Sequence, residues 1–137
     1  MKIKYNSLIP ELSVINIEES LRFYQTLGFN VLYKREKFYF LELYQNQIMI
    51  EEVNNNWNTA PLEYPFGRGI NISMTVKNIE KYYEYIKTKN IKIFLELKKT
   101  PYKVGDTTYY DTEFLIQDPN GYLLRFNNSH TIFKKLH

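Results

Sequence analysis

The stretch SVINIEESLRFYQTLGFNV, residues 13–31, carries the signals of a strand followed by a helix. Asn16 stands where the first backbone N–H groups of a helix need an acceptor, and Glu19, three residues later, completes a capping box. Gly28 stands where a left-handed residue commonly ends a helix. Between these signals the apolar residues recur at helical spacing, at Ile17, Leu21, Tyr24 and Leu27.

The pattern returns in TVKNIEKYYEYIKTKNIKI, residues 75–93, at an offset of 62 residues (76 − 14). Asn78 takes the place of the capping asparagine, and Asn90 is expected in the left-handed position at the helix end. A second pair, FLELYQNQIMIE (40–51) and FLIQDPNGYLLR (114–125), aligns at an offset of 74 (114 − 40). Two matches in the same order indicate a duplicated module, whose second copy has a longer hairpin around KKTPYKVGDTTYYD.

Each copy predicts the order strand, helix and three further strands, and hence an α+β fold of two βαβββ modules in a single domain, residues 1–137. In the first copy the strands are expected at 8–14, 29–35, 38–44 and 47–53, and in the second at 70–76, 91–97, 109–117 and 121–127. The boundaries are module one, 5–53; linker, 54–69; module two, 70–128; and C-terminal tail, 129–137.

Composition excludes several classes of site. The 137 residues contain no cysteine, which rules out disulfides, thiolate metal sites and cysteine nucleophiles. The two histidines, His130 and His137, both lie in the tail. No apolar run approaches the roughly 20 residues that span a membrane, and the stretch MKIKYNSLIPEL lacks the long apolar run of a signal peptide, so we expect a cytoplasmic protein without a membrane partner. The net charge is +3, and the scattered lysines favour a solvated surface over a nucleic-acid partner.

Three segments, IEESLRFYQTLGF, YPFGRGINISMTV and QDPNGYLLRF, resemble the glyoxalase, bleomycin resistance and extradiol dioxygenase superfamily, also called vicinal oxygen chelate proteins. The resemblance covers about residues 5–128, and the YPFGRG and GYLLRF strings are most similar to the bleomycin resistance branch. It implies that the modules form half-barrels and that the chain forms a homodimer, side by side or swapped, with ligand grooves at the interface.

In metal-dependent members of this superfamily, four matching strand positions supply the ligands. The positions here are Ile9, Glu51, Asn71 and Arg125. One carboxylate, one amide, one alkyl group and one cation do not make a divalent metal site, so no metal and no other cofactor is expected. Glu51 and Arg125 are expected to face each other, either as a binding element or as a structural ion pair. Since Arg125 would lower the pKa of Glu51, no catalytic residue is assigned.

The resemblance also implies a groove with aromatic walls. Each aromatic candidate is either such a wall or an ordinary core residue, and Trp57 in the linker is alternatively a dimer contact. The candidate ligand-binding residues are Tyr33, Phe38, Phe40, Glu51, Trp57, Tyr102, Tyr109, Tyr110 and Arg125.

The leading expectation is a binding protein that sequesters a bleomycin-type antibiotic or another small aromatic ligand and thereby confers resistance. The basic run Lys34, Arg35 and Lys37 beside the expected groove favours a neutral or anionic ligand over a cationic drug. The alternatives are a glyoxalase-like lyase or isomerase of unknown substrate, and a regulatory or interaction module.

Overall fold

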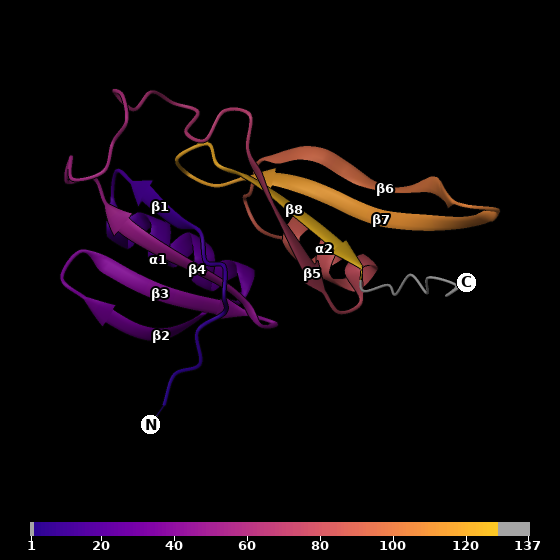
Figure 1. Ribbon diagram of the computed structural model, residues 1–137, viewed down its shortest axis with the longest axis horizontal. Helices are drawn as coiled ribbons and strands as arrows, with labels where there is room; N and C mark the ends of the chain where they lie inside the picture. The colour runs from indigo at the N-terminus through magenta and orange to yellow at the C-terminus, as the bar shows by residue number, and fades with distance from the viewer. Residues whose placement is uncertain (1, 129–137) are drawn as a thin grey trace.

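The computed structural model describes residues 2–128, so both histidines lie outside the described residues. Its elements occur in the predicted order twice (Figure 1), which confirms the α+β class and the two βαβββ modules. Module one contains β1 (Glu11–Val14), α1 (Ile17–Leu27), β2 (Asn30–Arg35), β3 (Phe38–Leu43) and β4 (Asn46–Glu52); module two contains β5 (Asn71–Val76), α2 (Ile79–Lys87), β6 (Ile93–Val104), β7 (Thr107–Gln117) and β8 (Leu123–Asn128).

Each module forms its own four-stranded sheet, in the order β1-β4-β3-β2 for module one and β5-β8-β7-β6 for module two. The first strand of each module runs parallel to the last, and the other pairs are antiparallel. β6 and β7 stay paired as far as Val104 and Thr107, and their hairpin projects away from the rest of the molecule (Figure 1). Neither helix is long and apolar enough to cross a membrane within the described range.

The helix caps follow the sequence signals at three of four places. The side chain of Asn16 accepts from the N–H of Glu19 at 3.0 Å, and Asn78 accepts from Lys81 at 3.4 Å. Gly28 ends α1 in the left-handed conformation, with φ 109°. The expectation for Asn90 is wrong, because α2 ends at Lys87 and its cap, Thr88, stays in the right-handed helical region.

One apolar cluster lies between the sheets and the helices and includes residues of both modules. Strand alternation sends every second side chain into this core. The end of α1 is also tied directly to α2, since the hydroxyls of Tyr82 and Tyr85 donate to the carbonyls of Leu27 and Thr26, both at 2.7 Å. The buried members from module one are Leu12, Val14, Ile17, Tyr24, Leu27, Phe29, Leu41, Leu43, Ile48 and Ile50; from module two they are Met74, Val76, Ile79, Tyr83, Ile86, Phe114, Ile116, Leu124 and Phe126.

The turn before β8 is the main polar joint between the modules. Asp118 accepts from the backbone N–H groups of Asn120 and Tyr122, at 2.8 and 2.9 Å, and so closes its own turn. Its second oxygen accepts from the hydroxyl of Tyr24 on α1 at 2.7 Å. The carboxyl group is buried, and this desolvation raises the pKa of Asp118 to about 6, although the hydrogen bonds act in the opposite direction.

Asn120 extends this joint to the linker and to the end of β1. Its side chain accepts from the N–H of Ile15 at 2.9 Å and donates to the hydroxyl of Ser20 at 3.1 Å. Its carbonyl accepts from the N–H of Phe66 in the linker at 2.9 Å. Asn46, which aligns with Asn120 in the repeat, donates to the carbonyl of Thr75 at 2.9 Å. Each of the two turns therefore contacts the other module, as expected of a duplicated unit.

Because the folded-state pKa of Asp118 is raised, the folded chain binds a proton more tightly than the unfolded chain between about pH 4 and pH 6. The contribution of Asp118 to the free energy of unfolding should therefore increase as pH falls from 7 through 6 towards 4. Urea unfolding at several pH values checks this. Asp118→Asn should remove this component of the slope, and Asp106→Asn, at the exposed hairpin turn, should keep it; equal slopes in all three proteins would contradict the assignment.

Gly121 and Gly105 both have positive φ, 93° and 62°, but only Gly121 is packed. A Cβ at Gly121 would meet atoms of Pro65 at 2.5 Å, whereas a Cβ at Gly105 would meet nothing within 4 Å. Gly105→Ala should therefore cost about 1 kcal/mol, from backbone strain alone. Gly121→Ala should cost about 2–5 kcal/mol, because overpacking is added to the strain. Denaturant unfolding measures both, and equal costs would argue against the packed joint.

Candidate functional site

Each sheet has one face against its helix and one face turned away from it, which we call the open face. On β3, Leu41 and Leu43 belong to the helix-packed core, so alternation places Phe38 and Phe40 on the open face of the module-one sheet. Phe40 is paired with Met49 on β4, and Phe38 with Glu51. The open face of module one therefore combines aromatic, thioether and carboxylate groups.

Three predicted aromatic residues meet on this face. Tyr33 packs edge-on against Phe40, with ring centroids 5.5 Å apart, and lies 5.8 Å from Phe38. The guanidinium of Arg35 lies 3.9 Å from the ring centre of Phe38, within the range of a cation–π contact. Phe38 and Phe40 are 1% and 0% exposed, yet they lie outside the helix-packed core. They therefore form a second, smaller aromatic cluster rather than part of the main core.

A residue that sequence reasoning missed, Tyr5, covers this cluster. Its ring stacks on Phe40 at 4.9 Å with an interplanar angle of 15°, and it lies edge-on to Tyr33 at 6.5 Å. A hydrogen bond with Tyr33, followed by partial desolvation, raises the pKa of Tyr5. The only signal for Tyr5 in the sequence is that it is an aromatic residue among polar ones before the first strand. This stretch has no periodic pattern that would predict where its side chains point.

Two carboxylates lie beside the aromatic cluster. Glu51 accepts from the side-chain amide of Asn54 at 2.7 Å. Burial, followed by a hydrogen bond with Glu51 and repulsion from its charge, raises the pKa of Glu11, while Arg35 acts in the opposite direction. Glu11 was not assigned from the sequence. The tertiary structure places it next to Glu51 because β1 pairs in parallel with β4.

Arg125 does not pair with Glu51, and this expectation is wrong for the described chain. Its Nη1 donates to Glu113 on β7 at 2.6 Å, and its Nε donates to the side-chain oxygen of Asn71 on β5 at 3.1 Å. The register places Leu115 opposite Arg125, so Glu113 lies diagonally across on the same open face. The cation is therefore satisfied within the module-two sheet.

The four positions that supply metal ligands in metal-dependent relatives do not fit a metal ion. Arg125 uses the side-chain oxygens of Asn71 and Glu113, and its own charge repels a cation. Ile9 offers no donor atom. No group of three or more histidine, aspartate or glutamate side chains is arranged to hold a metal in the described part of the chain. A metal-free site stays our prediction.

The remaining candidates lie on the hairpin and in the linker. Tyr102 and Tyr109 are paired across β6 and β7, and their rings stack at 5.8 Å. Alternation places Tyr109 on the same side of β7 as Glu113, whereas Tyr110 lies on the other side, half exposed, with Lys99 Nζ 4.9 Å from its ring centre. Trp57 is partly exposed in the linker. The nine predicted residues thus fall into separate groups within one chain.

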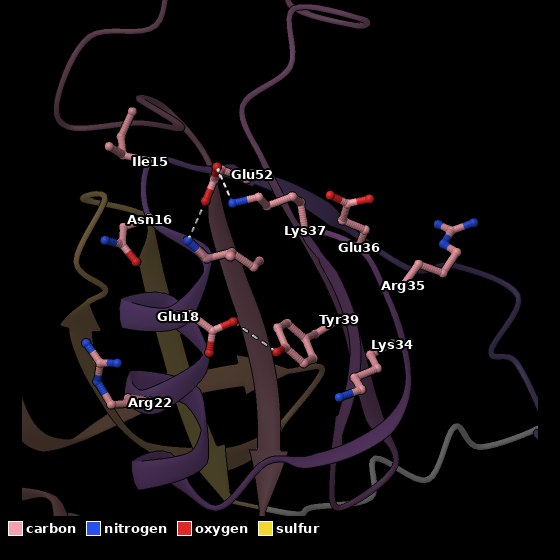
Figure 2. Close-up of a pocket in the computed structure, with 11 residues that line it drawn as sticks. Ile15, Asn16, Glu18, Arg22, Lys34, Arg35, Glu36, Lys37, Tyr39 and Glu52 are labelled. Carbon is pink, nitrogen blue, oxygen red and sulfur yellow. Dashed lines mark hydrogen bonds and ion pairs between the residues drawn. The ribbon is translucent and has the colours of Figure 1, made fainter.

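A large surface hollow of about 980 Å³ lies between the start of α1 and the hairpin of β2 and β3 (Figure 2). Glu52 accepts from the N–H of Ile17 at 3.1 Å and forms an ion pair with Lys37 at 3.4 Å. The hydroxyl of Tyr39 donates to Glu18 at 3.1 Å. The walls mix acids and bases, of which Glu52 and Lys37 form an ion pair. The lining residues are Ile15, Asn16, Ile17, Glu18, Arg22, Lys34, Arg35, Glu36, Lys37, Tyr39 and Glu52.

Comparison with solved structures shows the same fold at low sequence identity. A bleomycin resistance determinant encoded on the transposon Tn5 is 16% identical, with 93% of this chain and 100% of that chain covered and a TM-score of 0.64. A bleomycin-binding protein complexed with bleomycin gives 16% identity, 92% and 100% coverage and the same TM-score, 0.64. TioX from Micromonospora sp. ML1 gives 12% identity, 90% and 98% coverage and a TM-score of 0.69.

No curated protein sequence matches the chain at a significant level. The family model described as Glyoxalase/Bleomycin resistance protein/Dioxygenase superfamily matches residues 7–126, which include both modules and the linker. The chain therefore belongs to the glyoxalase, bleomycin resistance protein and dioxygenase superfamily.

Proposed function

We propose that this chain is a metal-free binding protein of the bleomycin resistance type, which sequesters a small aromatic molecule without chemical conversion. The observation that carries this proposal is the group of Tyr33, Phe38 and Phe40, which lies on an open sheet face instead of in the helix-packed core. Aromatic walls bind flat rings by stacking, at about 0.5–1.5 kcal/mol per ring beyond the burial of area. A bleomycin-binding protein with this fold has been solved with bleomycin bound, which supports the proposal.

The ligand groove is proposed to form in a homodimer. Within one chain the aromatic residues of module one and the stacked pair Tyr102 and Tyr109 lie on different sheets. β1 and β5 are the edge strands of their sheets, and the exposed apolar side chains of Leu8 and Ile70 lie beside them. Pairing of two copies along these edges would bring an open face of each module to the same groove and cover this apolar surface.

The charged side chains of the open faces and the net charge of the chain bear on which ligands are proposed. The open faces carry Glu11, Glu51 and Glu113 together with Arg35 and Arg125, and Arg125 is paired with Glu113. The acidic pair beside Phe38 suits a cationic group, whereas the overall charge of +3 favours neutral or anionic ligands over a distance. Bleomycin-type antibiotics are therefore one member of the proposed class, and neutral or anionic aromatic metabolites are another.

A second candidate function is a glyoxalase-like lyase or isomerase. The observation that favours it is the pair Glu11 and Glu51, in which one carboxyl group has a raised pKa next to a second carboxylate. Such a pair can divide acid and base roles between its members.

Isothermal titration calorimetry with bleomycin tests the leading proposal. The metal-free and the copper-loaded drug should both bind, with one groove contributed per chain, at low and at physiological salt. If the acidic pair attracts the cationic part of the drug, affinity should fall with rising salt, since screening weakens exposed charges. Absence of heat with either form, at protein concentrations that detect micromolar binding, would remove the drug from the proposed ligands.

Tyr109→Ala should weaken binding of an aromatic ligand about three- to tenfold, because it removes one stacking wall on the open face of module two. Tyr85→Ala is the matched control, since Tyr85 is an exposed tyrosine on α2, on the helix side of the same sheet. Its affinity should stay within about twofold of the unchanged chain. Equal losses in both variants would show that the effect comes from stability and not from ligand contact.

A further inference from the structure

The N-terminal segment, residues 4–6, lies over the open face of module one and is held there by a buried side chain. Gln47 on β4 is 5% exposed, and its amide oxygen accepts from the backbone N–H of Asn6 at 2.7 Å. Its amide nitrogen donates to the backbone carbonyl of Lys4 at 2.8 Å and to Glu42 at 2.8 Å. One glutamine therefore binds the segment on both sides of Tyr5, as a neighbouring strand would.

The ring of Tyr5 and these two backbone groups form one unit. The ring stacks on Phe40 while the carbonyl before it and the N–H after it are bound by Gln47. A further bond joins the side chain of Asn6 to the carbonyl of Gln45 at 2.7 Å. The segment belongs to no helix or strand, and Tyr5 is 51% exposed, so side-chain hydrogen bonds and ring contacts hold the segment in place of strand pairing.

We propose that the open face of module one contains a slot for an aromatic ring flanked by amide groups, and that Tyr5 fills this slot in the free chain. The slot is the surface formed by Phe40, Tyr33, Met49 and the amide of Gln47. A ligand ring takes the place of Tyr5 on Phe40, and the amides beside it take over the acceptor and the donor of Gln47. The inference rests on the proposed function, because it locates one ring of the proposed ligand.

The chemistry of the slot defines its ligand class as peptidic aromatic compounds. Release of the segment leaves Gln47, a buried donor and acceptor, without these partners, and unpaired buried polar groups are costly. A bare ring restores the stack alone, whereas a ring between an acyl carbonyl and an amide N–H restores the stack and both bonds. The need to displace Tyr5 also lowers the apparent affinity of the ligand, because only the fraction of the protein with an empty slot can bind it.

N-acetyl-tyrosinamide is the probe, since it reproduces the ring, the preceding carbonyl and the following N–H. It is titrated into the full chain labelled with ¹³C at the methionine methyl groups. Met49 lies on the open face beside Phe40, and Met74 is buried in the helix-packed core, so Met74 serves as the internal control. The variant Tyr5→Ala/Asn6→Pro removes the ring and the N–H that hold the segment, and Lys4→Ala/Ser7→Ala changes the flanking side chains alone.

The Tyr5→Ala/Asn6→Pro variant should bind the probe at least tenfold more tightly than the unchanged chain, with a shift of the Met49 methyl signal and none of Met74. Lys4→Ala/Ser7→Ala should behave like the unchanged chain. N-acetyl-alaninamide, without a ring, and p-cresol, without amides, should each bind at least tenfold more weakly than the probe. A folded Tyr5→Ala/Asn6→Pro variant with no gain in affinity, or equal binding of p-cresol, would overturn the proposal.

Hydrogen exchange in the unchanged chain gives a test that does not depend on the folding of a variant. Near-saturating probe should accelerate exchange of the Asn6 amide, because its bond to Gln47 is released. A Met49 shift with unchanged exchange of Asn6 would contradict displacement. Failure of bleomycin to bind leaves these outcomes intact and removes only the drug from the proposed ligands, whereas binding of bleomycin without a shift of Met49 counts against the slot alone.

Discussion

The buried hydrogen bonds of Asp118 and Asn120 are the constraint on which the rest of the structure depends. One short turn of module two binds the hydroxyl of Tyr24 in α1, the backbone after β1 and the backbone of the linker. If the modules packed in another orientation, these groups would be buried without partners, and burial of an unpaired polar group is costly. The apolar cluster supplies most of the stabilisation, but it is non-directional, so the polar joint fixes how the modules are oriented.

This orientation leaves one face of each sheet without a helix. The open face of module one carries aromatic rings and two carboxylates, and the open face of module two carries Arg125 with its partners Glu113 and Asn71. In a superfamily whose metal-dependent members bind an ion at these positions, a guanidinium now uses the oxygen atoms of module two. The site is therefore suited to recognition by stacking and hydrogen bonding more than to Lewis-acid chemistry.

The proposed function and the proposed slot both concern the open face of module one. The first gives a class of ligand, and the second locates one ring of that ligand. The proposed class of ligand rests on the aromatic cluster of Tyr33, Phe38 and Phe40, and the proposed chemistry next to one ring rests on the contacts of Gln47 on either side of Tyr5. A segment that is held by a few hydrogen bonds and one stack can exchange with a ligand of similar chemistry, because the two states differ by little in the contacts made.

The sequence by itself determined the order of the elements, the duplication and most helix caps, because periodicity and capping are local properties that the repeat records twice. It failed at Asn90, since α2 ends at Lys87, three residues before Asn90. It also located aromatic candidates without their orientation. Only the tertiary structure decided that Arg125 pairs with Glu113, that Glu11 meets Glu51, and that Tyr5 lies on Phe40. These contacts depend on strand register and on the path of a segment without regular structure, which local pattern does not encode.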